Sequence, residues 1–215
     1  MVRFVHVFVL TGILGSLSVN GRPSAMDLNI AFDGYLNEFK SGRSSARDVA
    51  TVSRNHRPPS DSNSYFTPGN YLSVDTPRME WDGLISNLVR SGDVRVERHE
   101  VIVQLRTSAK VRANLSATFG DNDVDSEFRE GTADVTYNFE IRLTINDGQL
   151  VDPSISIKSL TWNNLECTKT GPEPAVMSLY DWSDDICDTW QETYSRDMVT
   201  GAEKILSNGL ESVDK

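Results

Sequence analysis

The feature that most constrains the fold of this chain is a long, regular alternation of apolar and polar residues. From Val101 to Phe119 every odd position holds an apolar or small side chain, with Thr107 among them, and nearly every even position is polar. Successive residues of a strand point to opposite faces, so this period of two predicts a β-strand with one buried face. Fully extended, the run would measure about 60 Å, well beyond the common strand length. We therefore expect a strand that curves strongly, or one that a turn or bulge interrupts without changing its parity.

A second alternating run follows the first and predicts its antiparallel partner. Between Thr132 and Ile145 apolar side chains again occupy the odd positions. The shorter segment from Val124 to Glu130 is predicted to be the ragged start of this returning strand. Asn146-Asp147-Gly148 then provides one of the strongest sequence signals for a tight β-hairpin.

The third strand is expected from about Gln149 to Trp162. Pro153 has no backbone N–H to donate, and the parity of the apolar positions changes between Ile157 and Leu160. Both features are typical of an edge strand or of a β-bulge.

Three segments show the period of an amphipathic helix. The first runs from about Ser24 to Lys40, the second begins at Thr76-Pro77 and ends before Gly92, and the third runs from Ser183 to about Asn208. The third would be roughly 40 Å long, enough to lie along the extended sheet. Their apolar stripes are Leu28, Ala31, Phe32, Tyr35, Leu36 and Phe39; Trp81, Leu84, Ile85 and Leu88; and Ile186, Trp190, Tyr194, Met198, Ala202 and Ile205.

Together these elements predict an α+β fold. We expect a long, curved antiparallel β-meander packed on the long C-terminal amphipathic helix, with one or two shorter N-terminal helices. An antiparallel sheet with one dry face needs a cover, and the C-terminal helix is the obvious candidate. We assign residues 22–42 to the N-terminal amphipathic helix and 76–215 to the α+β domain.

Residues 43–75 are interpreted as a flexible polar linker. The stretch is rich in Ser, Arg, Asn and Pro and shows no sustained apolar period. A solvated linker is the favoured interpretation, and a docking segment for an acidic partner is the alternative. Its basic residues are Arg43, Arg47, Arg54 and Arg57.

The N-terminus has the pattern of a cleavable signal peptide over residues 1–21. A short basic start precedes the apolar run from Phe4 to Leu17, which is shorter than the about 20 residues that span a bilayer. Cleavage after Gly21 or after Ser18 would fit, and a buried core helix is the alternative interpretation. Roughly 195 residues would remain, the size of one domain. We expect the mature protein to be secreted and to contain no membrane span.

Export makes two covalent modifications plausible. Cys167 and Cys187 are the only cysteines, and such a pair in an exported chain predicts a disulfide, with two unpaired thiols as the alternative. The loop that it closes would contribute about 3 kcal/mol. Asn114-Leu115-Ser116 is the only N-glycosylation sequon in the mature chain, and Asn114 falls on the polar face of the first long strand.

Charge and motifs argue against several classes of function. The formal net charge of −10 repels phosphate backbones, and no basic stripe with interleaved aromatic residues occurs, so we expect no nucleic-acid partner. The sequence has no Ser-His-Asp or Cys-His arrangement, no glycine-rich phosphate loop and no zinc spacing. We therefore expect no catalytic residues, no metal and no cofactor, and we do not expect an enzyme.

The order of these elements resembles the tubular lipid-binding (TULIP-like) superfamily, in which a strongly curved sheet wraps a long helix. Its arthropod members include the takeout and juvenile-hormone-binding group and the group 7 mite allergens. The resemblance rests on the two alternating runs, the hairpin and the C-terminal helix, and it covers roughly residues 76 to 212. It is a resemblance of pattern, so no functional residue of the family carries over. It implies a non-enzymatic carrier of an apolar, lipid-like molecule.

A ligand of this kind would lie between the dry face of the sheet and the C-terminal helix. The competing class is a secreted glycoprotein of a matrix, egg coat, venom or immune response, with a filled core and an unidentified protein partner. A continuous internal cavity would favour the carrier, and a packed interior would favour the interaction protein. The candidate lining residues, each with ordinary core packing as its alternative role, are Val103, Leu105, Val111, Tyr137, Phe139, Ile141, Trp190, Tyr194 and Met198.

Overall fold

The computed structural model describes residues 25–41, 72–76, 78–119, 126–146, 149–171 and 183–211. Within these segments the chain forms two helices and a seven-stranded antiparallel sheet. The predicted signal peptide and the arginines of the predicted basic linker lie outside them. The α+β fold, with a long curved sheet and a long C-terminal helix, is confirmed.

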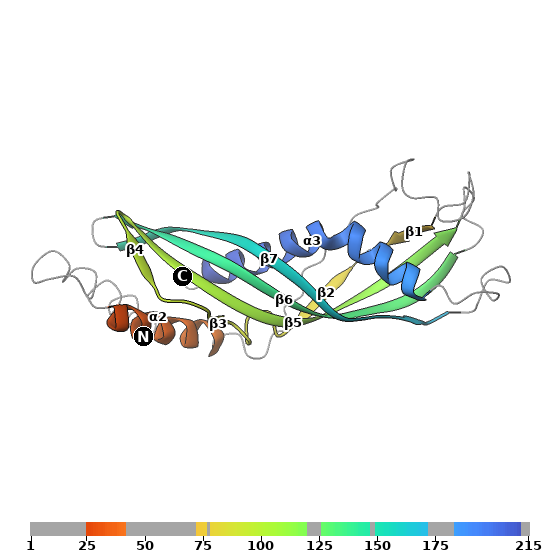
Figure 1. Cartoon of the computed structure of the whole chain (residues 1–215), viewed down its shortest axis with the longest axis horizontal. Coiled ribbons are helices and arrows are strands. Elements are labelled where there is room, and N and C mark those ends of the chain that lie inside the picture. The colour runs from red at the N-terminus through yellow and green to blue at the C-terminus, as the bar shows by residue number, and fades with distance from the viewer. Residues whose placement is uncertain are drawn as a thin grey trace, which may run out of the picture.

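Three very long strands form the body of the sheet (Figure 1). They are β5 (Glu100–Phe119), β6 (Ser126–Asn146) and β7 (Gln149–Lys169), of 20, 21 and 21 residues. β6 lies between the other two, and both pairings are antiparallel. The first alternating run is thus one unbroken strand, and its curvature accommodates its length.

Four short strands complete the sheet on the other side of β5. They are β1 (Leu72–Asp75), β2 (Met79–Asp82), β3 (Val89–Arg90) and β4 (Arg95–Glu97). Each pairs antiparallel with a different stretch of β5, so the chain runs back along that strand in steps. Since β1 occupies residues 72–75, the last part of the segment assigned to a linker belongs to the sheet.

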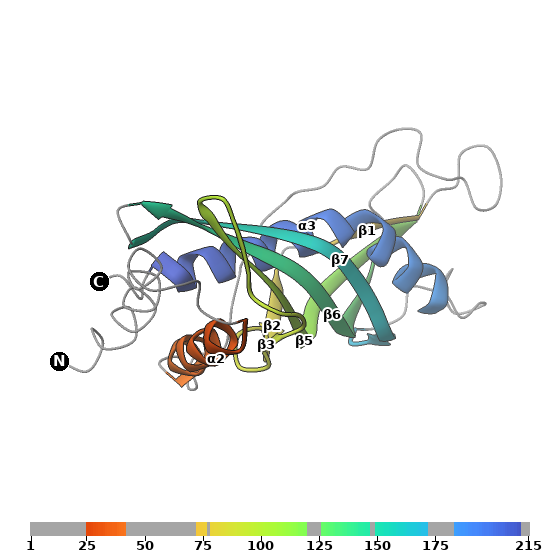
Figure 2. The same ribbon diagram turned by 60° about the vertical axis from the view of Figure 1, so that its left-hand side comes forward.

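The two helices cover different parts of the sheet. α3 (Ser183–Glu211) lies along the concave side of the long strands and contacts β7 and β1 (Figure 1). α2 (Ala25–Ser41) lies at one end of the sheet, on the side of β3 (Figure 2). The carboxylate of Glu203 in α3 accepts a hydrogen bond from the backbone N–H of Ile157 in β7 at 3.0 Å. This contact helps α3 to protect the edge of β7 with which no described strand pairs.

We call the curved sheet with α3 in its concave face the roll. Its inner face is built by the odd positions of β5 and β6, and the stripe of α3 packs on them in one continuous apolar core. One end of the roll is covered by α2 and is called the α2 end. The other, the disulfide end, carries the bond between Cys167 and Cys187.

The prediction of a helix between Thr76 and Gly92 is wrong. This segment forms β2, a turn over 83–87 and β3. Gly83 has a φ of +87°, a turn conformation that interrupts a helix, and β2 pairs in register with residues 110–113 of β5. Pairing with the long strand therefore overrides the local helical period. The stripe is nevertheless buried, with at most 1% exposure for Trp81, Leu84, Ile85 and Leu88.

β7 is an edge strand with irregular pairing, as Pro153 and the change of parity predicted. Its register against β6 shifts at three places, and one of them leaves Lys158 without a paired residue, within the stretch where the parity changes. The strand continues beyond the expected end at Trp162 and reaches Lys169. The reason is that β6 continues to offer pairing partners as far as Arg129.

The predicted disulfide is present at the disulfide end of the roll. Cys167 near the end of β7 and Cys187 in the first turn of α3 have Cα atoms 5.7 Å apart and are separated by 20 residues in sequence. Trp162 of β7 and Trp190 of α3 pack edge to face, with ring centroids 5.3 Å apart. The covalent bond and the two indoles together hold the start of α3 on the sheet.

Gly131 of β6 allows α3 to approach the sheet closely. A Cβ atom at this position would lie 2.8 Å from Cδ1 of Leu115 and 2.8 Å from Cζ3 of Trp190. Both neighbours are buried, at 2% and 0% exposure, so they have little room to move. The absence of a side chain at Gly131 is therefore required by packing.

Replacing Gly131 by alanine is expected to lower the free energy of unfolding by about 1–3 kcal/mol, because the added methyl group overpacks this contact. Chemical denaturation measures the loss. Gly171→Ala is the matched control, since a Cβ atom there would lie 3.6 Å from its nearest neighbour, Cβ of Phe128. Its stability should change by less than about 0.5 kcal/mol. Equal stabilities of the two variants would contradict the close approach.

Candidate ligand-binding site

The residues predicted to line a ligand site all point into the roll. They come from β5, β6 and α3 and belong to one apolar core. Their burial agrees with the predicted inward direction, whereas a role in binding stays a prediction. None is more than 5% exposed: Val103, Leu105, Val111, Tyr137, Phe139, Ile141, Trp190, Tyr194 and Met198.

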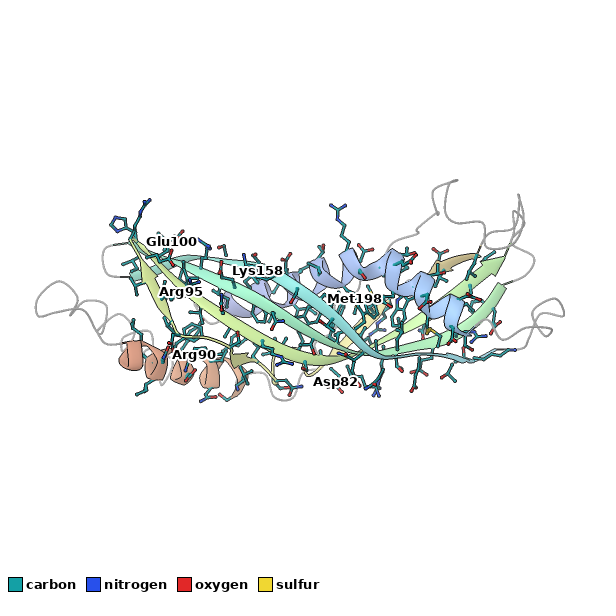
Figure 3. All side chains as sticks on the ribbon, in the orientation of Figure 1. Asp82, Arg90, Arg95, Glu100, Lys158 and Met198 are labelled. Carbon is teal, nitrogen blue, oxygen red and sulfur yellow. A yellow bond between two sulfur atoms is a disulfide. The ribbon has the colours of Figure 1, made fainter. Side chains whose placement is uncertain are left out.

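Two tyrosine hydroxyls tie α3 to the strands in the middle of the roll. Nε1–H of Trp81 donates a hydrogen bond to Oη of Tyr137 at 2.8 Å, and that hydroxyl donates to the backbone carbonyl of Met198 at 3.4 Å. Figure 3 shows Met198 on the side of α3 that faces the sheet. The backbone N–H of Thr76 donates to Oη of Tyr194 at 2.7 Å. In the middle of the roll, the core is therefore filled by side chains and cross-linked by these hydrogen bonds.

Burial also sets the protonation of these two phenols. Desolvation raises the pKa of Tyr137 far above its usual value, and the bond from Trp81 opposes this only in part. Burial likewise raises the pKa of Tyr194, against the bond from the backbone of Thr76. Both groups are neutral hydroxyls at physiological pH, so neither is suited to act as a general base.

An entirely apolar pocket lies at the α2 end of the roll. Of the predicted lining residues, Leu105, Phe139 and Ile141 contribute to it, and the others lie elsewhere in the core. Its free volume is about 10 Å³, at the lower limit for a single water molecule. With α2 in place the pocket is therefore too small to hold a ligand. It is lined by Phe32, Tyr35, Leu36, Phe39, Leu88, Leu105, Phe139, Ile141, Ile155 and Leu206.

α2 supplies a wall of the pocket that sequence reasoning did not assign to the site. The helical period marked Phe32, Tyr35, Leu36 and Phe39 as one apolar face and predicted core packing for them. That face does pack on the roll, beside side chains from β5, β6, β7 and α3. A period reveals which side of a helix is buried, but it carries no information about the surface that buries it.

Polar contacts of residues that flank the pocket lining in sequence hold α2 on the roll, and we call this region, which includes Asp33 and Arg90, the rim. Nε and Nη2 of Arg90 in β3 donate to Oδ1 and Oδ2 of Asp33 in α2, both at 2.9 Å. Figure 3 shows Arg90 beside α2. This two-point ion pair has the geometry in which an arginine binds a carboxylate most strongly. Further contacts join Asn29 to the side chain of Asp93 and the backbone of Val94, both at 2.8 Å, and Lys40 to the carbonyl of Leu88 at 3.0 Å.

The described residues contain no group of three His, Cys, Asp or Glu side chains close enough to hold a metal ion. Neither of the two helices that the structure describes is long and apolar enough to cross a membrane. Asn114 is exposed on the outer face of β5, where its sequon is accessible, and its glycosylation stays a prediction.

No family model matches the sequence, and no curated protein matches it.

Proposed function

We propose that this chain is a secreted, non-enzymatic carrier of a small apolar molecule, which it binds between the curved sheet and its helices. The observation that carries this proposal is the entirely apolar pocket at the α2 end, walled by α2, three long strands and α3. Concave sites with apolar walls are the usual form of a small-molecule site. The resemblance to the tubular lipid-binding superfamily supports the same class of ligand.

Binding requires α2 to move, because a free volume of about 10 Å³ is far below the about 300–1,000 Å³ of ordinary ligand sites. This movement would break no strand pairing, but it would break the polar contacts of Asn29, Asp33 and Lys40 with the roll. The apolar face of α2 covers the pocket, and an apolar ligand would replace that face against the same walls. The exchange keeps the walls out of water and so limits the free energy that opening costs.

Uptake of an apolar molecule by the delipidated mature protein tests the proposal. We expect displacement of a fluorescent lipid probe and a one-to-one complex in native mass spectrometry. Ile155→Trp should weaken binding about tenfold or more, which corresponds to about 1.4 kcal/mol, because the larger ring fills the pocket that Ile155 lines. Leu165→Trp is the matched control, on the same strand and also half-buried, outside the pocket lining. A protein that takes up no apolar molecule in either assay would overturn the carrier function.

A secreted glycoprotein that acts through its surface is the second candidate. The specific observation that favours it is the filled interior, in which the tyrosine hydrogen bonds and the large buried side chains leave little free volume. Asn114 would then carry its glycan on the outer face of the sheet. The uptake assay separates the two functions, since a permanently filled roll binds no lipid probe.

A further inference from the structure

We propose that the ligand carries a carboxylate, as a long-chain fatty acid does, and that Arg90 binds this carboxylate in place of Asp33 when α2 moves away. The inference rests on the proposed function and adds to it the chemical class of the ligand and the residue that recognises its headgroup. The apolar tail would occupy the pocket, and the headgroup would lie at its rim.

The position of Arg90 links the rim to the pocket. Arg90 lies in the short strand β3, two residues after Leu88, whose side chain lines the pocket. Its side chain is only 20% exposed, although it carries a full positive charge. A single-chain molecule whose tail lies against Leu88 would therefore place its headgroup close to this cation.

The Asp33–Arg90 pair is asymmetric in a way that favours exchange of the carboxylate. The arginine belongs to the sheet and the aspartate to α2, so the carboxylate is the partner that leaves when α2 moves. Asp33 is already 46% exposed, and it becomes hydrated at little cost. Nε and Nη2 of Arg90 would lose both bonds to Asp33, and the carboxylate that stays nearby is that of Asp93, 3.9 Å from Nη1. Two charged donors that have lost their acceptor favour binding of another carboxylate.

Arg90 keeps its orientation without Asp33. Its third nitrogen, Nη1, donates to the backbone carbonyl of Gly92 at 2.7 Å, a contact within the segment that contains β3. Nε and Nη2 therefore stay aimed at the place that the carboxylate of Asp33 occupies. A ligand carboxylate can form the same planar two-point contact there, with no reorganisation of the receptor side.

One movement of α2 supplies both parts of the binding site. It opens the apolar pocket, which is too small for any ligand while α2 is docked, and it frees the guanidinium of Arg90. A neutral apolar molecule would gain only the first of these. A fatty acid gains both, which predicts a preference for the acid over the alcohol of the same chain length.

The test compares oleic acid with oleyl alcohol on the full mature protein, with displacement of a neutral fluorescent probe as the readout. For the wild type we expect the acid to bind more tightly than the alcohol. Arg90→Gln should lower the acid-to-alcohol affinity ratio about 10-fold to 100-fold, the effect of a charged hydrogen-bonded pair. Arg112→Gln, which removes an exposed arginine from the outer face of β5, is the matched control and should leave the ratio unchanged.

The affinity ratio separates headgroup recognition from a role of Arg90 in holding α2 closed. If Arg90 only holds α2, both Arg90→Gln and Asp33→Asn will raise the affinities for acid and alcohol alike, and the inference is overturned. If Arg90 recognises the headgroup, Asp33→Asn should strengthen binding of the acid, whereas Arg90→Gln should weaken it relative to the alcohol.

Should Arg90→Gln fail to fold, Arg90→Lys keeps the charge without the planar guanidinium and should lower the acid-to-alcohol affinity ratio less strongly. Binding of neither molecule by the wild type would instead reject the carrier function itself.

Discussion

Replacing Arg129 by methionine is expected to lower the free energy of unfolding by about 3–5 kcal/mol, because it leaves a buried carboxylate without its partner. Arg129 and Glu127 both point into the disulfide end of the roll and are 6% and 1% exposed. Nε of Arg129 donates to Oε1 of Glu127 at 2.6 Å. Oε2 of Glu127 has no hydrogen-bond partner among the described residues, so this carboxylate depends on the arginine. Urea denaturation of the purified variant measures the loss.

Arg129 also connects three elements at this end of the roll. Its Nη1 donates to the backbone carbonyl of Cys167 at 2.9 Å and to the hydroxyl of Ser183 at the start of α3. The double variant Glu127→Leu/Arg129→Met removes both charges and should recover most of the stability, because no unpaired charge is left behind. If the double variant were as unstable as Arg129→Met alone, the contacts to Cys167 and Ser183 would account for the loss, and the unpaired charge would not.

The alternating pattern predicted the long strands well because it reports on one physical variable, the face of the sheet to which a side chain points. Val101–Phe119 and Thr132–Ile145 lie within β5 and β6, and the odd positions are buried as far as Ala117 and Ile141. Leu143 and Ile145 are partly buried. The same variable explains why the start of β6 looked ragged in the sequence. Glu127 and Arg129 occupy inward positions with charged side chains, and only their pairing in the fold makes such positions tolerable.

The helix expected between Thr76 and Gly92 shows the limit of a local period. The spacing of Trp81, Leu84 and Ile85 fits a helix, yet these residues are buried from a strand and a turn that β5 holds in place. Four apolar residues at helical spacing indicate burial more securely than they indicate a helix. Contacts with a strand that follows later in the chain decided the outcome.

The candidate site was only partly accessible from the sequence for a related reason. Alternation identified the side chains that face the interior, but it could not separate the filled middle of the roll from the pocket at the α2 end. The pocket exists where α2 meets the sheet, and that contact joins Phe39 to Leu88 and Phe139, which are far apart in the chain. Arg90 was not predicted either, because one arginine beside Asp93 resembles any exposed charge pair until α2 brings Asp33 to it.

Loss of the disulfide is expected to lower the free energy of unfolding by about 3 kcal/mol, the chain-entropy contribution of a loop of this length. Cys167→Ala/Cys187→Ala is the variant to measure, and reduction of the wild-type protein should give a similar loss in the same denaturation experiment. The two measurements control each other, since reduction keeps both side chains and the double variant removes them. A loss near zero in both would mean that the rest of α3 holds the disulfide end together unaided.

The position of the disulfide also predicts what its loss should leave unchanged. The bond lies at the start of α3, whereas Leu206, which lines the pocket, lies near the other end of the same helix. Between them Tyr194 and Met198 accept hydrogen bonds from Thr76 and Tyr137, and these contacts fix the middle of α3 independently of the disulfide. In buffer without denaturant, where the double variant is still folded, its affinity for an apolar probe should therefore match that of the wild type. A large loss of affinity in the folded variant would show that the two ends of the roll are coupled through α3, and that the pocket depends on how the whole helix is seated.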